Sequence, residues 1–149
     1  MIRECFPYLR VRVRGGAEAI AFYERAFGAR ERFRLVDPEN GRVGHAELEL
    51  APGTVLMLSE AYPELGIEAP AAGHTPTSSV HLHVDDADAF VARAIAAGAT
   101  VKRPLRDQFY GERSGAIVDP FGHEWLVGHA LEELPPDEMQ RRWNALAAG

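Results

Sequence analysis

The chain has 149 residues, 46% of them hydrophobic, so it can bury the core of one compact domain, and no apolar stretch approaches the roughly 20 residues that cross a bilayer. Acidic side chains outnumber basic ones by 22 to 16, and the resulting net charge of −6 argues against a protein that tracks nucleic-acid phosphates. With one cysteine, Cys5, and no export or organelle signal at its start, the sequence predicts a soluble, cytoplasmic protein in which Cys5 is a packed, inert thiol.

The first predicted strand lies at residues 6–13 and includes the run RVRVR, in which arginine alternates with valine. Because side chains two positions apart share one face of a strand, Arg10, Arg12 and Arg14 are expected to point the same way. Such a row is either an exposed strand face or an anion-facing wall of a pocket, and the exposed face is the favoured interpretation.

Two segments of the chain repeat each other, and both have the pattern of a helix. AEAIAFYERAFGA at 17–29 aligns without a gap with ADAFVARAIAAGA at 87–99, and each carries apolar residues at spacings of three and four. Gly28 and Gly98 are expected to end these helices, and the two aspartates of HVDD suit the N-terminal end of the second one.

Alternation of apolar and polar residues around these helices predicts eight strands, separated by turn sequences such as DPENG, APG and DPFG. The strands are expected at 6–13, 30–36, 42–50, 54–59, 79–84, 100–105, 114–118 and 123–129. The chain therefore divides into two modules of one strand, one helix and three strands, at 1–60 and 79–130. A Pro- and Gly-rich connector at 61–78 joins them, and a helical tail at 131–149 is expected to pack on the body or on a second subunit.

The motifs PYLRV, AIAFYERAFGA, GHAELEL, VLMLSE, HLHVDD, AAGATV, DQFYGERSG and DPFGHEW follow one another along nearly the whole chain. In this order they resemble the vicinal oxygen chelate superfamily of glyoxalase, bleomycin-resistance and ring-cleaving dioxygenase proteins, and more narrowly its PhnB-like subgroup. The resemblance implies an α+β fold of two βαβββ modules, whose sheets curl into a cup with the helices outside and the ligand inside, and it implies a homodimer. Because the fold hosts isomerases, transferases, dioxygenases and plain binding proteins, it does not fix the reaction.

Within the implied cup, alternation sorts the side chains of each strand by face. Trp125 and Val127 should pack against the helices, whereas His123 and His129, which flank the last strand, are expected at a turn or on the surface. The inward, ligand-lining side chains are expected to be Tyr8, Arg10, His45, Glu47, Met57, Ser79, His81, His83 and Leu126.

The segment DQFYGERSG has two interpretations. In one, Phe109 and Tyr110 lie at the mouth of the cup and bind a planar or apolar ligand. In the other, the segment is a tight turn in which Arg113 pairs with a carboxylate such as Asp107 or Asp119. DPFG is expected to be a turn and no more.

Metal-dependent members of the superfamily hold their ion with one residue from each of the first, fourth, fifth and eighth strands. In this chain those positions fall at Phe6 or Tyr8, Met57, Ser79 and Leu126. None of these is the His, Gln or Glu expected there, so the resemblance predicts no metal of the usual kind and no other cofactor. A different divalent-metal site on His45, Glu47 and His81 is chemically feasible but disfavoured, because the sequence does not establish that their ligating atoms converge.

Two functions remain open. The favoured one is the binding of a small organic molecule in the cup, without the usual metal and without nucleic-acid or membrane partners. The alternative is a lyase or isomerase that acts on a small carbonyl compound, with Glu47 and His81 as catalytic groups and an unconventional metal as an option. Against it, His45 and His81 could simply hydrogen-bond to each other or to the backbone of a wet cavity.

Overall fold

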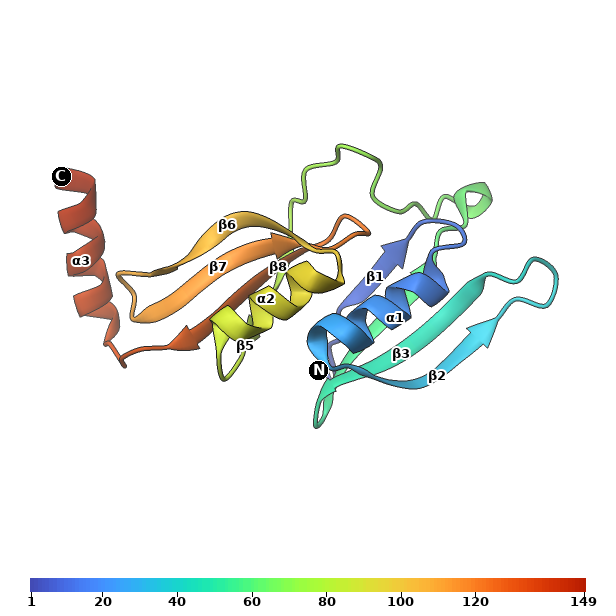
Figure 1. The fold of residues 1–149 in the computed structure, drawn as a ribbon, viewed down its shortest axis with the longest axis horizontal. Helices are drawn as coiled ribbons and strands as arrows, with labels where there is room; N and C mark the ends of the chain where they lie inside the picture. Colours follow the sequence, from blue (N-terminus) through green and yellow to red (C-terminus); the bar gives the residue numbers. More distant parts are fainter.

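The computed structural model describes residues 1–149 and contains two four-stranded sheets and three helices (Figure 1). The first module consists of β1 (Tyr8–Val11), α1 (Gly16–Phe27), β2 (Arg30–Val36), β3 (Val43–Ala51) and β4 (Thr54–Glu60). The second consists of β5 (Ser79–His83), α2 (Ala87–Ala97), β6 (Thr100–Asp107), β7 (Glu112–Val118) and β8 (Glu124–Ala130). A short 3-10 turn, η1 (Pro63–Leu65), lies in the connector, and α3 (Pro136–Ala148) forms the tail. The predicted α+β fold with two βαβββ modules is confirmed.

The two sheets have the same internal order. Their strands run β1-β4-β3-β2 and β5-β8-β7-β6, so that the first strand of each module is an edge strand and pairs in parallel with the last. The remaining pairs are antiparallel. Parallel neighbours need a crossover, and the helix of each module provides it.

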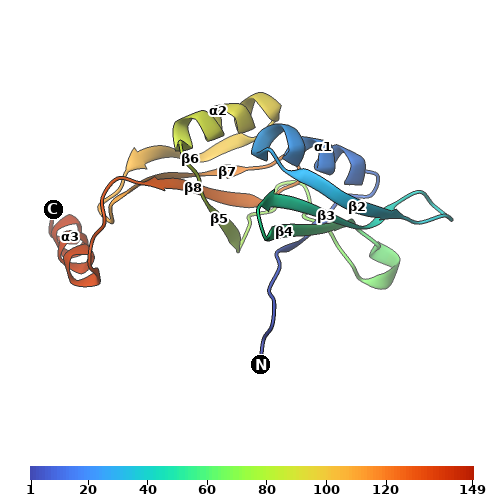
Figure 2. The ribbon, with the colours of Figure 1, turned by 90° about the horizontal axis from the view of Figure 1, so that it is seen from below.

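Both crossover helices cover the same side of the molecule, α1 over the first sheet and α2 over the second (Figure 2). The alternation in the strands explains why, since the apolar positions face the helices and form one core that spans both modules. Phe27 of α1 lies 4.8 Å from the Trp125 ring of β8 and 5.1 Å from the Phe90 ring of α2. As predicted, Trp125 and Val127 are buried in this core.

The opposite faces of the two sheets carry no helix, and within one chain they do not close over one another. The sheets lie side by side (Figures 1 and 2). The reason is that the two modules are joined through α1 and α2, which places both helix-free faces on the same side of the chain. Each of these faces is therefore open, and it carries the side chains expected to line a ligand.

The DPFG turn between β7 and β8 does more than the sequence predicts. The buried carboxylate of Asp119 accepts hydrogen bonds from the hydroxyl of Tyr23 (2.6 Å) and from Nε1 of Trp125 (2.8 Å). The backbone N–H groups of Phe121 (2.8 Å) and His123 (3.1 Å) donate to its other oxygen. One carboxylate thus ties helix α1 of the first module to the last strand of the second.

The arginine run near the N-terminus is not one continuous strand, which corrects the prediction. β1 ends at Val11, and the chain then turns, with the N–H of Gly15 bonded to the carbonyl of Arg12 and with Arg14 in the left-handed region at φ 65°. The buried carboxylate of Glu60 accepts the backbone N–H groups of Arg14 and Val43 and holds this turn. Only Arg10 lies on the strand face.

Other local predictions are settled by contacts. Gly28 ends α1 at φ 68°, and the side chain of Asp86 caps α2 by accepting the N–H of Ala89. His129 accepts the N–H of Ala87 at 2.9 Å, so it stabilises the start of the same helix. Cys5 is exposed rather than packed, because β1 begins only at Tyr8 and nothing covers the segment before it.

The tail helix α3 stands at one end of the molecule (Figure 1) and has no buried residue. Its contacts with the rest of the chain include the Trp143 ring, 5.1 Å from that of Phe109, and Arg142, which donates to the Phe109 carbonyl and to the Glu132 carboxylate. None of the helices is both long enough and apolar enough to cross a membrane.

Candidate functional site

The helix-free face of the first sheet carries a chain of three hydrogen-bonding side chains. The hydroxyl of Tyr8 on β1 lies 2.8 Å from Nδ1 of His45 on β3, and Nε2 of that histidine lies 3.4 Å from Oε1 of Glu47. In the sheet register Tyr8 and Glu47 flank Met57 from opposite sides, so these residues form one row across three strands. A phenol, an imidazole and a carboxylate are therefore linked on an open surface.

The direction of these hydrogen bonds follows from the chemistry of the groups. An ionised carboxylate only accepts, so a neutral His45 that bonds to Glu47 carries its proton on Nε2 and leaves Nδ1 free to accept from the phenol. Such an arrangement can take up a proton at one end and release it at the other. The guanidinium of Arg32 lies 3.3 Å from the second oxygen of Glu47 and forms an ion pair with it.

The positively charged side chain of Arg10 lies beside these three hydrogen-bonded groups. The guanidinium of Arg10 lies over the ring of Tyr8, 4.5 Å from its centroid, and donates to the buried hydroxyl of Ser59. On the other side, the ring of Phe33 lies 5.7 Å from that of His45. The surface therefore offers aromatic faces and one positive charge next to the polar groups, a combination suited to a planar or amphipathic molecule.

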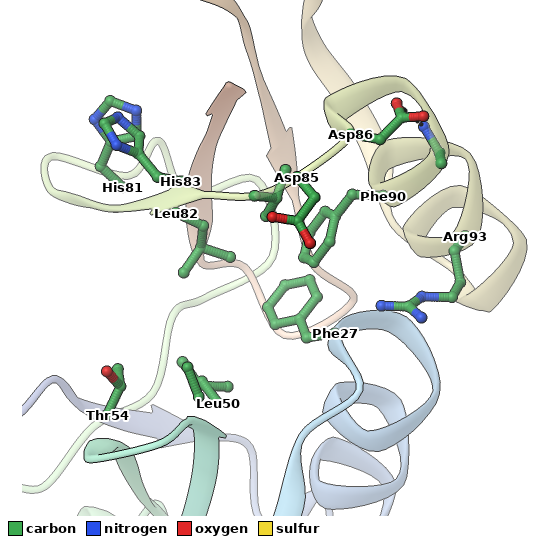
Figure 3. A pocket seen from close by; sticks show the side chains of 13 residues that line it. Phe27, Leu50, Thr54, His81, Leu82, His83, Asp85, Asp86, Phe90 and Arg93 are labelled. Carbon is green, nitrogen blue, oxygen red and sulfur yellow. Dashed lines mark hydrogen bonds between the residues drawn. The ribbon is translucent and has the colours of Figure 1, made fainter. Parts of the chain in front are cut away.

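The helix-free face of the second sheet carries a different cluster. His81 and His83 on β5 have their rings edge to face with centroids 4.7 Å apart, and Glu112 on β7 reaches both. Its carboxylate lies 2.9 Å from Nε2 of His83 and 3.9 Å from Nε2 of His81. Figure 3 shows the two imidazoles on one side of β5, while Leu82 between them points the other way.

Two grooves adjoin these faces. One, of about 720 Å³, runs from His81 and His83 around the edge of β5 to Phe27 and Phe90 (Figure 3). The other, of about 570 Å³, is lined by Tyr8, Arg10 and Ser79 and by connector residues between 68 and 78. The connector thus covers part of the space between the edge strands of the two sheets.

The remaining predicted site residues lie in the second module. Leu126 lies next to His81 in the sheet register, on the same face. The hydroxyl of Tyr110 lies 2.5 Å from that of Ser114, whereas Phe109 is in contact with α3. Arg113 pairs with Asp88 and with Asp107, as in the turn interpretation of this segment, and not with Asp119.

Neither set of metal-ligand positions considered from the sequence forms a metal site in the structure. The positions that the superfamily uses for its ion hold an aromatic ring, a thioether, a hydroxyl and an alkyl side chain in this protein. They do not fit a divalent transition-metal ion, which is held mainly by imidazole, carboxylate or thiolate donors. Of the alternative set, His45 and Glu47 lie together on the first sheet, whereas His81 lies on the second sheet with His83 and Glu112.

Glu112 is the site residue that the sequence did not reveal. Its spacing from Ser114 places it on the helix-free face of β7, and that much is readable from alternation. Its approach to β5 depends on the pairing of β7, β8 and β5, which no local pattern contains.

Comparison with known proteins places this geometry in a wider context. Residues 6–127 match the glyoxalase/bleomycin resistance protein/dioxygenase superfamily. The uncharacterized protein Mb0911c of Mycobacterium bovis is 39% identical over 137 residues, which cover 89% of this chain and 88% of that protein.

Solved structures agree at the level of the fold. The crystal structure of protein PA1353 from Pseudomonas aeruginosa superposes with a TM-score of 0.70 at 24% identity, over 88% of this chain and all of that one. A PhnB protein from Bacillus cereus gives a TM-score of 0.66 at 19% identity, over 86% of this chain and 100% of that one.

Proposed function

Because the chain belongs to the glyoxalase/bleomycin resistance/dioxygenase superfamily, we propose that it binds a small, planar or amphipathic organic molecule on the helix-free faces of its sheets, without a metal at the position its superfamily uses. The proposal rests on the helix-free face of the first sheet. There, the partly exposed aromatic and polar groups around His45 are already hydrogen-bonded into a fixed arrangement. Preformed clefts with aromatic walls and a few placed polar groups are typical of small-molecule sites.

The proposal includes a homodimer in the cytoplasm. One chain leaves both helix-free faces open, and the first of them exposes large apolar side chains such as Phe33 (42%) and Tyr8 (41%). A second copy that lays its own sheets against these faces would enclose the ligand and bury those side chains. Sedimentation at micromolar concentration should then give twice the chain mass of 16.4 kDa, and a monomer at all concentrations would refute this part.

The binding itself can be tested with 8-anilinonaphthalene-1-sulfonate, a planar aromatic anion whose fluorescence rises in apolar surroundings. A saturable titration of the metal-free protein is expected. Met57→Glu should abolish it, because a carboxylate in the middle of the Tyr8–Glu47 row would repel the sulfonate of the dye. Ile95→Asp, which removes an exposed apolar side chain from α2 on the opposite side, is the matched control and should bind as the wild type does. Equal loss in both variants would contradict the proposal.

A second candidate, a lyase or isomerase for a small carbonyl compound, is favoured by one observation. The Tyr8–His45–Glu47 chain connects groups that can remove a proton from a carbon next to a carbonyl and return it elsewhere. The expected signature is exchange of the α-protons of dihydroxyacetone in D₂O, followed by NMR. Tyr8→Phe and His45→Ala should each abolish the exchange. Exchange that persists in both variants would remove these residues from the mechanism.

A further inference from the structure

The strongest unexplained feature is the group of His81, His83 and Glu112 on the second sheet. Strand alternation puts both imidazoles on the same face, and all three ligating atoms lie within 4.8 Å of one another. Both Nε2 atoms are turned toward one carboxylate, at 2.9 and 3.9 Å. A single ion pair would need only one of the two histidines, so the convergence of both needs its own explanation.

A glycine on the strand between the histidines and Glu112 leaves space for the Glu112 side chain. The strand between β5 and β7 is β8, and its position next to His83 on one side and next to Ser114 on the other is Gly128. A Cβ at this glycine would lie 3.4 Å from Oε2 of Glu112 and 3.1 Å from Cβ of Ser114. A side chain at this position would crowd Ser114 and touch the carboxylate, so the glycine leaves room for Glu112 beside β8.

From this arrangement we infer that His81, His83 and Glu112 form a binding site for a divalent transition-metal ion such as Zn²⁺. Imidazole and carboxylate ligands suit that class of ion, with bonds of about 2.0–2.2 Å. A tetrahedral ion with such bonds holds its ligand atoms roughly 3.3–3.5 Å apart. The two carboxylate–imidazole spacings, 2.9 and 3.9 Å, lie on both sides of that value, so side-chain rotations that draw the three groups together would complete the set.

The site is open on one side. The side chains of His81 and His83 are 43% and 66% exposed, and that of Glu112 is 19% exposed. Three protein ligands leave at least one coordination position free, as in metal sites that bind a water or a substrate atom. The site lies apart from the superfamily position on this strand, which is Ser79, two residues before His81. It does not depend on the proposed organic ligand.

The test is zinc binding by untagged protein, with no organic ligand present. After removal of metal with a chelator, titration calorimetry and plasma mass spectrometry should find one Zn²⁺ per chain. His83→Ala and Glu112→Gln should each weaken the affinity at least about tenfold, because even the hydrogen-bond partners of metal ligands have effects of that size. Zn²⁺ should also raise the melting temperature of the wild type, and at the same Zn²⁺ concentration it should raise that of His83→Ala by less.

Three matched variants make the result specific. His74→Ala removes an exposed histidine of the connector, Cys5→Ser removes the exposed thiol, and His45→Ala removes the imidazole of the first sheet. All three should bind Zn²⁺ as the wild type does. The inference is overturned if the wild type takes up no zinc, or if His74→Ala or Cys5→Ser reduces uptake as much as His83→Ala does. Dye binding by the metal-free protein is measured separately, so either proposal can fail without the other.

Discussion

Replacing Tyr23 by phenylalanine tests how the two modules are held together. The buried hydroxyl of this residue donates to Asp119 at 2.6 Å, and the same carboxylate oxygen accepts from Trp125. The substitution keeps the ring, which packs 5.6 Å from the indole, and removes only the hydroxyl. Asp119 would keep three of its donors, so the expected loss is that of one hydrogen bond to a charged group.

Such a bond contributes about 1.5–3 kcal/mol, so Tyr23→Phe should lower the free energy of unfolding by about 2 kcal/mol. For a chain of this length, that loss corresponds to a fall in melting temperature of about 4–8 °C. Tyr62→Phe is the matched control, because the Tyr62 hydroxyl donates to Asp37 over 3.3 Å and closer to solvent. Its expected loss is about 1 kcal/mol or less.

The assay is urea unfolding followed by circular dichroism at one fixed protein concentration. The pH dependence of the free energy of unfolding gives a second test. Burial, followed by the charge and hydrogen bond of Asp119, raises the pKa of Tyr23 well above its ordinary value. The unfolded chain therefore ionises this residue from about pH 10 while the folded chain does not, and stability that is complete below that pH is lost as the pH rises further. Tyr23→Phe should lose less stability above pH 10, and a variant within 0.5 kcal/mol of wild type with an unchanged alkaline response would refute the reasoning.

Two further predictions concern the second module. Hydrogen bonds from Arg113 lower the pKa of Asp88, so the stabilisation by this pair is present above the ordinary carboxyl range near pH 4 and is lost as the pH falls below it. In urea melts between pH 5 and pH 2, the free energy of unfolding should therefore fall less steeply for Asp88→Asn than for the wild type. An equal fall in both proteins would exclude this pair as its cause. Gly128→Ala should lower the free energy of unfolding by about 1–3 kcal/mol through overpacking against Ser114 and should weaken zinc binding as well, whereas unchanged zinc affinity would show that Glu112 does not need the space left by this glycine.

Local patterns predicted the elements and the faces of the strands well. The repeat of two helices, the glycine that ends α1 and the burial of Trp125 follow from periods of 3.6 and 2 and from turn chemistry, all of which are readable along the chain. The placement of His81 and His83 on one face had the same origin.

The features that the sequence did not predict all depend on contacts between distant segments. Asp119 looks like an ordinary turn residue until α1 of the other module brings Tyr23 to it, 96 positions away in the chain. The regular alternation of the arginine run predicts one strand. In the structure the strand ends at Val11, and the carboxylate of Glu60 stabilises the turn that follows by accepting the N–H of Arg14. Glu112 meets β5 only through a register across three strands.

The central claim is that a small molecule binds on the helix-free faces of the sheets. The most direct measurement is an ¹H–¹⁵N NMR titration of the metal-free protein with 8-anilinonaphthalene-1-sulfonate. The account predicts shifts for the amides of β1, β3 and β4, strongest around Tyr8, His45 and Met57, with those of α1 and α2 unchanged. Shifts confined to the helices or to the tail α3, with the strands unaffected, would contradict it.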